Sequence, residues 1–267
     1  MNMLPSVLLV GCGNMGGALW NGWLREGLAP SVVVDRHLES VPTPHRLVRK
    51  AEDIPADFHP HFIVLAVKPA GMETTIAALA PWLPGSLLVS MLAGRTGASL
   101  KAACEKAGKV IPVIRAMPNT PSAIGKGVTG AFSEDIDDSQ RAECTHLLAA
   151  VGKVAWVENE EQLVALTTIS GCGPAYVFLL AELLEREGQR HGLSHELARM
   201  LARETIAGSG ALLATSPEES ATLRKNVTSP NGVTAKALEV LMAADAWPQT
   251  LERAIDQAAQ RARELAV

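Results

Sequence analysis

The chain has 267 residues, which suits one large domain or two ordinary domains and is enough to bury a sizeable core. Its content of 48% hydrophobic and 19% charged residues is typical of a soluble globular protein, and a net charge of −4 gives no electrostatic reason to expect nucleic acid or an anionic membrane as a partner. No run approaches the roughly 18 apolar residues of a membrane span, and no basic segment precedes the first apolar stretch, so neither a membrane helix nor a signal peptide is expected.

A glycine-rich turn lies near the start of the chain, between an apolar run and a helical pattern. The run Val7–Val10 predicts a buried strand, and residues 14–26 predict a helix. Between them, Gly11 permits a tight turn, Gly13 lets a pyrophosphate approach the backbone, and Gly16 lets helix and strand pack closely, as a dinucleotide-binding turn requires. The helix N-terminus would present free N–H groups and a partial positive charge to the phosphates. The alternative is a tight turn without a ligand.

An acidic and a basic residue follow the second predicted strand, residues 31–34. Asp35 lies about 20 positions beyond the glycines, where a carboxylate accepts hydrogen bonds from the adenosine ribose hydroxyls and favours NAD. Arg36 can pair with a 2′-phosphate, which favours NADP. Because these adjacent residues favour different cofactors, the choice between NADH and NADPH stays open. The alternative for Asp35 is a solvated strand end.

Strand and helix patterns alternate up to residue 157, which is typical of an α/β domain with a parallel sheet. Residues 43–60 are polar and rich in proline, and they predict a loop with one short helical piece. After residue 157 the alternation of strands and helices stops, so we expect two domains, residues 1–158 and 159–267. Further strands are predicted at 62–67, 86–90, 110–114, 127–132 and 154–157, and helices at 70–80, 97–107 and 138–151.

Two polar segments follow strands at the carboxyl edge of the predicted sheet. Lys68-Pro69 ends the strand at 62–67, and Arg115–Pro121 forms a proline-stiffened loop after the strand at 110–114. Ligands bind outside the carboxyl ends of parallel strands, so both segments are predicted to face the cofactor crevice. A solvated lysine is the alternative at Lys68.

Beyond residue 158 every pattern is helical. The loop 227–234 contains the turn residues Ser229-Pro230-Asn231-Gly232 and precedes a helix. Backbone N–H groups at that helix N-terminus suit a carboxylate, and Thr234 adds a hydroxyl there. The alternative for Thr234 is an ordinary N-cap. Helices are predicted at 160–169, 175–191, 194–214, 216–227, 235–243 and 248–265, with a break at 170–174.

The sequence lacks the common signatures of hydrolytic and metal chemistry. It has no HExxH or GxSxG motif and no clustered set of His and Cys ligands, so no metal site is expected. The four cysteines show no CxxC spacing and are interpreted as reduced thiols of a cytoplasmic protein.

Five motifs together resemble the pyrroline-5-carboxylate reductase family. The resemblance implies an N-terminal Rossmann-type doubly wound sheet and a C-terminal all-helical domain that binds substrate and forms a homodimer or a higher homo-oligomer. It also implies NAD(P)H-dependent reduction of 1-pyrroline-5-carboxylate, a cyclic imine, to L-proline, the last step of proline biosynthesis. The motifs are Gly-Cys-Gly-Asn-Met-Gly (11–16), Ala-Val-Lys-Pro (66–69), Arg-Ala-Met-Pro-Asn-Thr-Pro (115–121), Ser-Gly-Cys-Gly-Pro-Ala-Tyr (170–176) and Val-Thr-Ser-Pro-Asn-Gly-Val-Thr (227–234).

The resemblance also implies roles for single residues. Thr234 would be the catalytic residue, with its hydroxyl near the ring nitrogen while hydride passes directly from the nicotinamide to the imine carbon. The substrate would contact Ser229, Gly232, Val233 and Thr234, with Glu160 as a further candidate. The cofactor would contact Gly11, Cys12, Gly13, Asn14, Met15 and Gly16 at the pyrophosphate, and elsewhere Ala66, Val67, Lys68, Pro69, Ala93, Asn119 and Asn226, in addition to Asp35 or Arg36.

Three positions depart from the family's pattern. Asn231 replaces the first of two glycines in the substrate loop, and Arg224-Lys225 replaces Lys-Asp before it. Residues 48–57 lack a clear counterpart of an asparagine that is usual in the family. Asparagine tolerates left-handed backbone conformations better than most residues, so the substrate loop is compatible with Asn231.

Two other functions compete with this interpretation. A β-hydroxyacid or imine reductase of similar build normally has a catalytic lysine on the first long helix after the domain boundary, and residues 175–185 contain none. A non-catalytic nucleotide-binding regulator would keep the glycine turn without needing the 227–234 loop.

The small residues 207–211 would let another helix approach closely, which favours a dimer. The sequence gives neither the size of a larger oligomer nor regulation by proline.

Overall fold

The computed structural model describes residues 3–266, and the chain divides into two compact units. The first unit extends to Cys172 and takes in the C-terminal residues from Ala259 onward, and the second is Gly173–Ala258. Each unit is described by itself.

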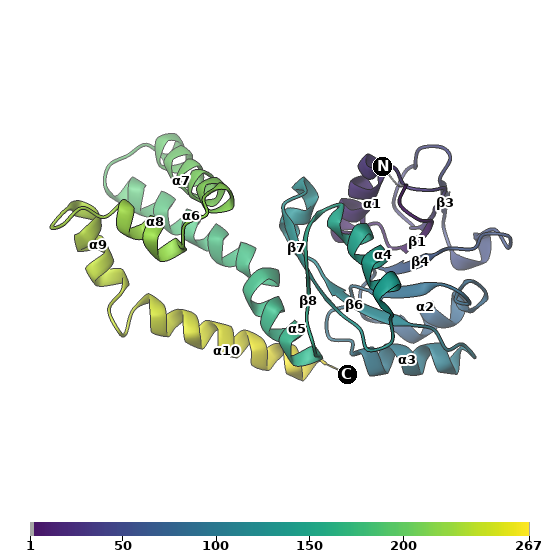
Figure 1. Cartoon of the computed structure of the whole chain (residues 1–267). Helices are drawn as coiled ribbons and strands as arrows, with labels where there is room; N and C mark the ends of the chain where they lie inside the picture. Colours follow the sequence, from purple (N-terminus) through teal and green to yellow (C-terminus); the bar gives the residue numbers. More distant parts are fainter. Residues whose placement is uncertain (1–2, 267) are drawn as a thin grey trace. The chain divides into compact units, whose positions relative to one another are not determined.

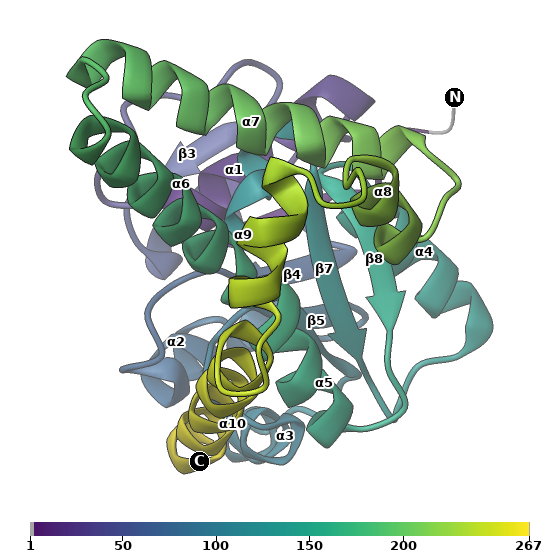
Figure 2. The same ribbon diagram turned by 90° about the vertical axis from the view of Figure 1, so that its left-hand side faces the viewer.

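The first unit is built on one eight-stranded sheet with the strand order β3-β2-β1-β4-β5-β6-β7-β8. Figure 1 labels β1, β3, β4, β6, β7 and β8 of this sheet. Every neighbouring pair is parallel except β6 and β7, and Figure 2 shows β7 and β8 pointing the same way. The order runs outward from β1 and β4 in both directions, which confirms the doubly wound sheet and places its switch point beside β1. The strands are β1 (Val7–Val10), β2 (Val32–Val34), β3 (Arg46–Val48), β4 (Phe62–Leu65), β5 (Leu87–Ser90), β6 (Val113–Met117), β7 (Gly127–Phe132) and β8 (Gly152–Trp156).

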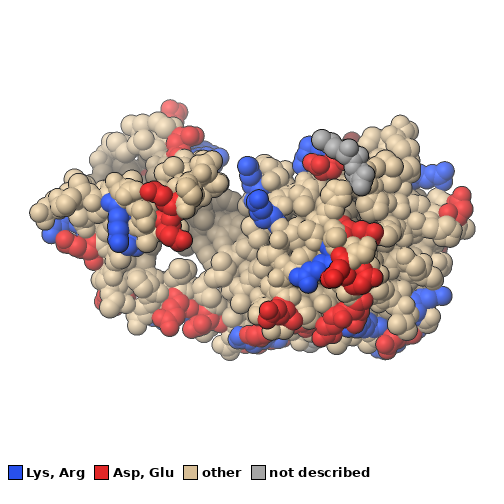
Figure 3. Space-filling model, viewed as in Figure 1, with Lys and Arg blue, Asp and Glu red and all other residues tan. Residues whose placement is uncertain are grey.

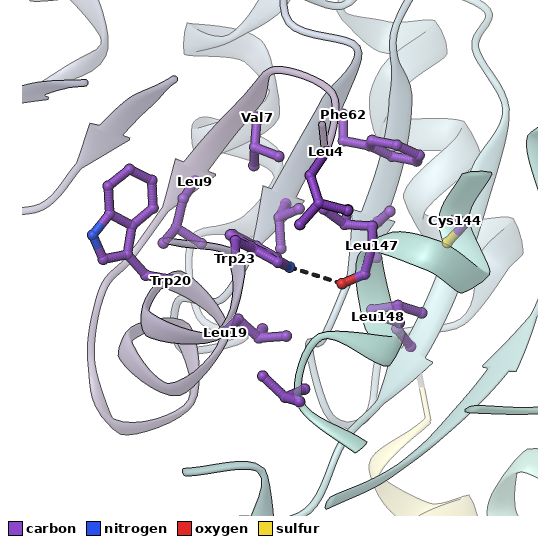
Figure 4. Close-up of a cluster of buried hydrophobic side chains, with 14 of the residues drawn as sticks. Leu4, Val7, Leu9, Leu19, Trp20, Trp23, Phe62, Cys144, Leu147 and Leu148 are labelled. Atoms are coloured by element: carbon purple, nitrogen blue, oxygen red, sulfur yellow. Dashed lines mark hydrogen bonds between the residues drawn. The ribbon is translucent and has the colours of Figure 1, made fainter. Parts of the chain in front are cut away.

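Helices cover both faces of the sheet. Successive strand side chains point to opposite faces, so Leu9 packs with α1 (Asn14–Glu26) and α4 (Asp138–Ala149), while Leu8 packs with α2 (Met72–Ala78) and α3 (Gly97–Lys106). On the first face, the buried indole of Trp23 donates a hydrogen bond of 2.9 Å to the Leu147 carbonyl oxygen and so joins α1 to α4 (Figure 4). The two apolar layers fix the sheet edge on which the candidate site lies.

Two predictions in the first unit were wrong. The segment 43–60 contains β3 as well as the short 3-10 helix Ala51–Asp53, because three residues of modest hydrophobicity find a parallel partner in β2. The strand predicted at 110–114 is shifted to β6, and Val110 is 90% exposed. Arg115 to Met117, predicted as loop, extend β6 because β7 supplies antiparallel partners for all three.

The predicted break at residues 170–174 was also wrong. The chain passes from α5 (Glu160–Leu166) through a π-helical turn (Thr167–Gly171) into α6 (Gly173–Arg190). The N–H of Cys172 donates to the Thr167 carbonyl oxygen at 2.9 Å, five residues back, so the glycines widen the helix instead of ending it.

The second unit consists of helices, as predicted. Gly188 lies against Ala198, which lets α6 and α7 (His195–Thr215) pack closely, and Ser194 caps α7 by accepting a hydrogen bond from Leu197 N at 3.3 Å. The remaining helices are α8 (Ser220–Asn226), α9 (Val233–Leu241) and α10 (Trp247–Leu265), of which α10 ends in the first unit.

Apolar side chains of the second unit are largely exposed. Ala198 and Ala202 are its only buried hydrophobic residues in the described part of the chain, whereas Phe178 on α6 is 65% exposed and Leu213 on α7 is 52% exposed. The second unit therefore has little core of its own and carries an apolar surface.

One helical run, Glu160–Arg190, is long and apolar enough to cross a membrane by length and composition. This corrects the expectation that no segment approaches that composition. The pattern was missed because threonines, serine and glycines interrupt the apolar residues without adding a charge between 162 and 181. One such helix is weak evidence for a membrane, because helices of soluble proteins pass the same test.

Candidate active site

The glycine turn forms an open cradle at the N-terminus of α1. Gly11 has a φ of +92°, which a side chain rarely adopts, and a Cβ on Gly16 would overlap the Gly11 carbonyl oxygen. By contrast, a Cβ on Gly13 would meet nothing within 4 Å. No side chain caps α1, so its first N–H groups face this open space. The cradle fits a pyrophosphate group.

The carboxyl ends of β4 and β5 lie at the same edge as the glycine turn. A Cβ on Gly11 would lie 2.8 Å from Val67 Cγ1 and 2.9 Å from the Ala66 carbonyl oxygen, so this segment packs on the turn. Lys68 and Ala93 are exposed beyond it, and the Pro69 carbonyl oxygen accepts a hydrogen bond from Arg95 at 3.4 Å. The structure therefore brings together the residues predicted at the pyrophosphate and nicotinamide.

Asp35 is bound by main-chain N–H groups. One carboxylate oxygen accepts from Cys12 N at 2.7 Å, and the other accepts from His37 N and Leu38 N, each at 2.8 Å. Burial by itself would raise the pKa of Asp35, but these three donors hold it below the ordinary value. Burial, with the Asp35 charge nearby, raises the pKa of the Cys12 thiol to about 11.

The Asn119 side chain joins the motif at 115–121 to the motif at 170–176. Its side chain is buried, with Oδ1 accepting from Val128 N at 2.8 Å and Nδ2 donating to the Ser170 carbonyl oxygen at 2.9 Å. In a regular helix that carbonyl would accept from the N–H of residue 174, but Pro174 has none. Asn119 therefore supplies the missing donor at the π-helical turn.

This pairing predicts a coupled stability effect. Asn119→Ala is expected to lower the free energy of unfolding by about 1–3 kcal/mol, because it leaves buried main-chain groups unpaired. In a Pro174→Ala background residue 174 regains an N–H, so the same substitution should cost less. Denaturant unfolding of the four proteins of this double-mutant cycle measures the coupling. Additive effects would contradict the assignment.

Arg115 and Glu160 form a second polar link that the sequence did not reveal. Arg115 lies on β6 and is 8% exposed, and its Nη1 is 3.3 Å from Glu160 Oε1. The same oxygen accepts from Gly97 N at 2.6 Å, at the start of α3. Glu160 thus ties the start of α5 to the sheet edge, and its contact with substrate stays a prediction.

The predicted substrate residues lie at the start of α9, in the second unit. Gly232 is the N-cap of this helix, so Thr234 is not the cap but an exposed residue of the first turn. Asn231 has a φ of +56°, which confirms that asparagine accommodates the left-handed conformation. Gly232 N donates to the Ser229 carbonyl oxygen at 3.0 Å, and Val233 is 91% exposed. No side chain caps α9, so its N–H groups are available to an anion.

Asn226 is the last residue of α8 and lies directly before the loop 227–234. Its amide donates to Glu218 Oε2 at 3.2 Å. The contact of Asn226 with the cofactor stays a prediction.

Known proteins resemble the chain over its whole length. Residues 160–265 match the family described as pyrroline-5-carboxylate reductase dimerisation, and residues 6–94 match the family of coenzyme F420-dependent NADP oxidoreductases. Pyrroline-5-carboxylate reductase of Pseudomonas aeruginosa is 35% identical over 98% of this chain and 97% of its own.

Two solved structures show the same fold over the full length of both chains compared. A pyrroline-5-carboxylate reductase from Coxiella burnetii has a TM-score of 0.89 at 29% identity. The Plasmodium falciparum pyrroline carboxylate reductase, solved with NADP bound, has a TM-score of 0.82 at 27% identity.

Proposed function

The chain belongs to the pyrroline-5-carboxylate reductase family, and from this premise we propose how its residues carry out the NAD(P)H-dependent reduction of 1-pyrroline-5-carboxylate to L-proline. The observation that supports the proposal is the pair of uncapped helix N-termini, α1 behind the open cradle at Gly13 and α9 beside Thr234. One suits the cofactor's pyrophosphate and the other suits the substrate's carboxylate.

NAD(P)H supplies a hydride from nicotinamide C4 to the imine carbon when bound. The N–H groups of α1 hold the pyrophosphate in the Gly13 cradle, and Ala66 and Val67 fix the adjoining edge of the sheet. The protein therefore contributes mainly positioning, which removes much of the entropic cost of bringing two reactants together.

Thr234 acts on the substrate side. The substrate's carboxylate binds the free N–H groups at the start of α9, and the Thr234 hydroxyl hydrogen-bonds the ring nitrogen. An imine carbon accepts hydride more readily when its nitrogen is protonated or hydrogen-bonded. Hydride forms the new C–H bond while the C=N π electrons move to nitrogen, which takes up a proton and becomes the secondary amine of proline.

A spectrophotometric assay tests this function. Purified protein with pyrroline-5-carboxylate should oxidise NADPH or NADH, measured as loss of the cofactor's absorbance, and should form proline. A folded protein that binds the dinucleotide without oxidising it in the presence of substrate would favour a nucleotide-binding regulator.

The helical domain supports a homodimer. Residues 160–265 match a dimerisation family, and the exposed apolar residues of α6 and α7 give a second copy a surface to cover.

We place the boundary between the cofactor and dimerisation domains near residue 158. We place the protein in the cytoplasm, where its four free cysteines stay reduced. On the face shown in Figure 3, charges of both signs are interspersed, which gives no basic surface for nucleic acid.

Phe178→Glu tests the dimer. A charge on this exposed apolar face is expected to shift the protein from dimer to monomer in sedimentation velocity, because a buried unpaired carboxylate opposes association. Ala142→Glu, an exposed position of α4, adds the same charge to the first unit and should leave the dimer intact. A monomeric wild-type protein would refute the proposed dimer.

A further inference from the structure

The last turn of α10 lies against the loop that follows β5. We call residues 91–96, which join β5 to α3, the β5–α3 loop. Within this loop Gly94 has a φ of +72°, and a Cβ there would lie 2.5 Å from the Leu265 carbonyl oxygen and 3.2 Å from Leu265 Cβ. Residues from Ala259 onward belong to the first unit, so this contact lies within one unit. The end of the chain therefore packs on a loop at the carboxyl edge of the sheet, at a position where only glycine leaves it room.

An arginine of the same turn ties α10 to α5. Arg263 Nε donates to both carboxylate oxygens of Glu161, at 3.0 and 3.3 Å, and its Nη2 donates to Oε1. These hydrogen bonds hold the pKa of Glu161 below its ordinary value. The side chains are 55% and 61% exposed, and an exposed ion pair adds little to stability. Two guanidinium nitrogens on one carboxylate nevertheless fix its geometry, so the pair serves to place the last turn of α10.

The β5–α3 loop is also held at other points. Glu160, the neighbour of Glu161 on α5, accepts from Gly97 N at 2.6 Å, where the loop enters α3. Arg95 donates to the Pro69 carbonyl oxygen at 3.4 Å. Ala93, the residue of this loop that is predicted to contact the cofactor, is exposed. The first turn of α5 therefore holds the loop twice, directly through Glu160 and by way of α10 through Glu161.

We propose that the last turn of α10, tied to Glu161 by Arg263, positions the β5–α3 loop against the nicotinamide half of the cofactor. The proposal rests on the nucleotide binding of the proposed function and adds residues that act at its reacting end. Arg263 and Glu161 are positioning residues, because they act on the loop through the contact of Leu265 with Gly94. In the proposed function the pyrophosphate binds at the start of α1, so the orientation of the nicotinamide depends on this loop more than the affinity for the whole cofactor does.

Arg263→Gln tests the proposal with two independent measurements. Amide hydrogen exchange of residues 92–97 in the cofactor-free protein should become faster. The kcat with NADPH and pyrroline-5-carboxylate should fall about 5-fold, because misplacing a reacting group by about 1 Å costs on the order of 10²-fold and losing one exposed pair permits a smaller displacement. The Kd for NADP+ and the midpoint of thermal unfolding should stay close to those of the wild type, whereas a merely structural pair would change the midpoint and leave kcat unchanged.

A matched control comes from the same turn. Arg261 is also an exposed arginine, but its Nη1 is 2.9 Å from Glu264 Oε2, so its partner lies on α10 itself. Arg261→Gln removes the same charge and should change neither the hydrogen exchange of residues 92–97 nor kcat.

Exchanging the two charges separates the pair from other effects of either residue. Arg263→Glu places two carboxylates together and should lower kcat about 10-fold. Combining it with Glu161→Arg restores an ion pair and should recover most of the wild-type kcat and the slow exchange of residues 92–97. Failure of this recovery would overturn the proposal, as would faster exchange in Arg263→Gln without a change in kcat. A folded wild-type chain that does not oxidise NADPH would overturn the proposed function, and the exchange measurement would still decide whether α10 holds the loop.

Discussion

Thr234→Ala is expected to lower kcat for pyrroline-5-carboxylate reduction on the order of 10²-fold, which is the usual effect of removing one hydrogen bond to a reacting atom. The free energy of unfolding should stay close to that of the wild type, because Thr234 is exposed in the first turn of α9 and is not its cap. Cofactor binding should also be unchanged. Steady-state kinetics, thermal unfolding and titration with NADP+ of the same preparation measure the three quantities.

Two further variants make this result specific. Thr234→Ser keeps the hydroxyl and should recover most of the activity, whereas a packing role for the threonine methyl would predict no recovery. Thr222→Ala, an exposed threonine on α8, should behave as the wild type. If Thr234→Ala kept the kcat and KM of the wild type, the assignment of Thr234 to the ring nitrogen would be wrong.

Gly13→Val is expected to weaken cofactor binding without unfolding the protein. Gly13 has a negative φ of −73° and open space around its missing Cβ, so the fold accepts a side chain there. That side chain fills the space in front of the α1 N-terminus, and displacing a pyrophosphate by about 1 Å should cost on the order of 10²-fold in kcat/KM. Titration with NADP+ and thermal unfolding distinguish lost binding from lost structure.

Other glycines of the same helix are the controls. Gly16→Ala should also destabilise the fold, by about 1–3 kcal/mol, because its Cβ would overlap the Gly11 carbonyl oxygen. Gly17→Ala should retain both binding and stability, since its Cβ would be 3.6 Å from the nearest atom, an ordinary contact. Unchanged cofactor affinity in Gly13→Val would show that the cradle does not hold the pyrophosphate.

Local pattern was sufficient to predict most of the fold. Four consecutive apolar residues at Val7–Val10, a glycine turn and a helical period gave β1, the turn and α1 with their observed bounds. Such elements are predictable because burial on both faces of a parallel sheet leaves a continuous apolar run. A two-part organisation was expected from the same reasoning, since the strand pattern ends where the helical pattern begins, and the boundary near residue 158 stays a prediction.

Several elements depended on partners distant in sequence. β3 is a strand because β2 lies beside it, and Arg115 to Met117 are strand because β7 pairs with them. The helix passes through residues 170–174 because Asn119, 51 positions earlier, donates to the Ser170 carbonyl oxygen. No local pattern contains these partners, so proline and glycine signals were interpreted as a loop and a break.

Some features of the candidate site were likewise predictable from local sequence, and others depended on residues distant in the chain. The sequence by itself determined the residue types of the cradle and of the α9 loop, because the chemistry of each is local to a few consecutive residues. Only the tertiary structure decided what Asp35 contacts, since the folded backbone brings main-chain N–H groups to both of its carboxylate oxygens. Hydrogen-bond partners are set by the folded backbone, and for that reason the sequence could offer Asp35 as a ribose ligand but could not show that main-chain groups of the protein bind it.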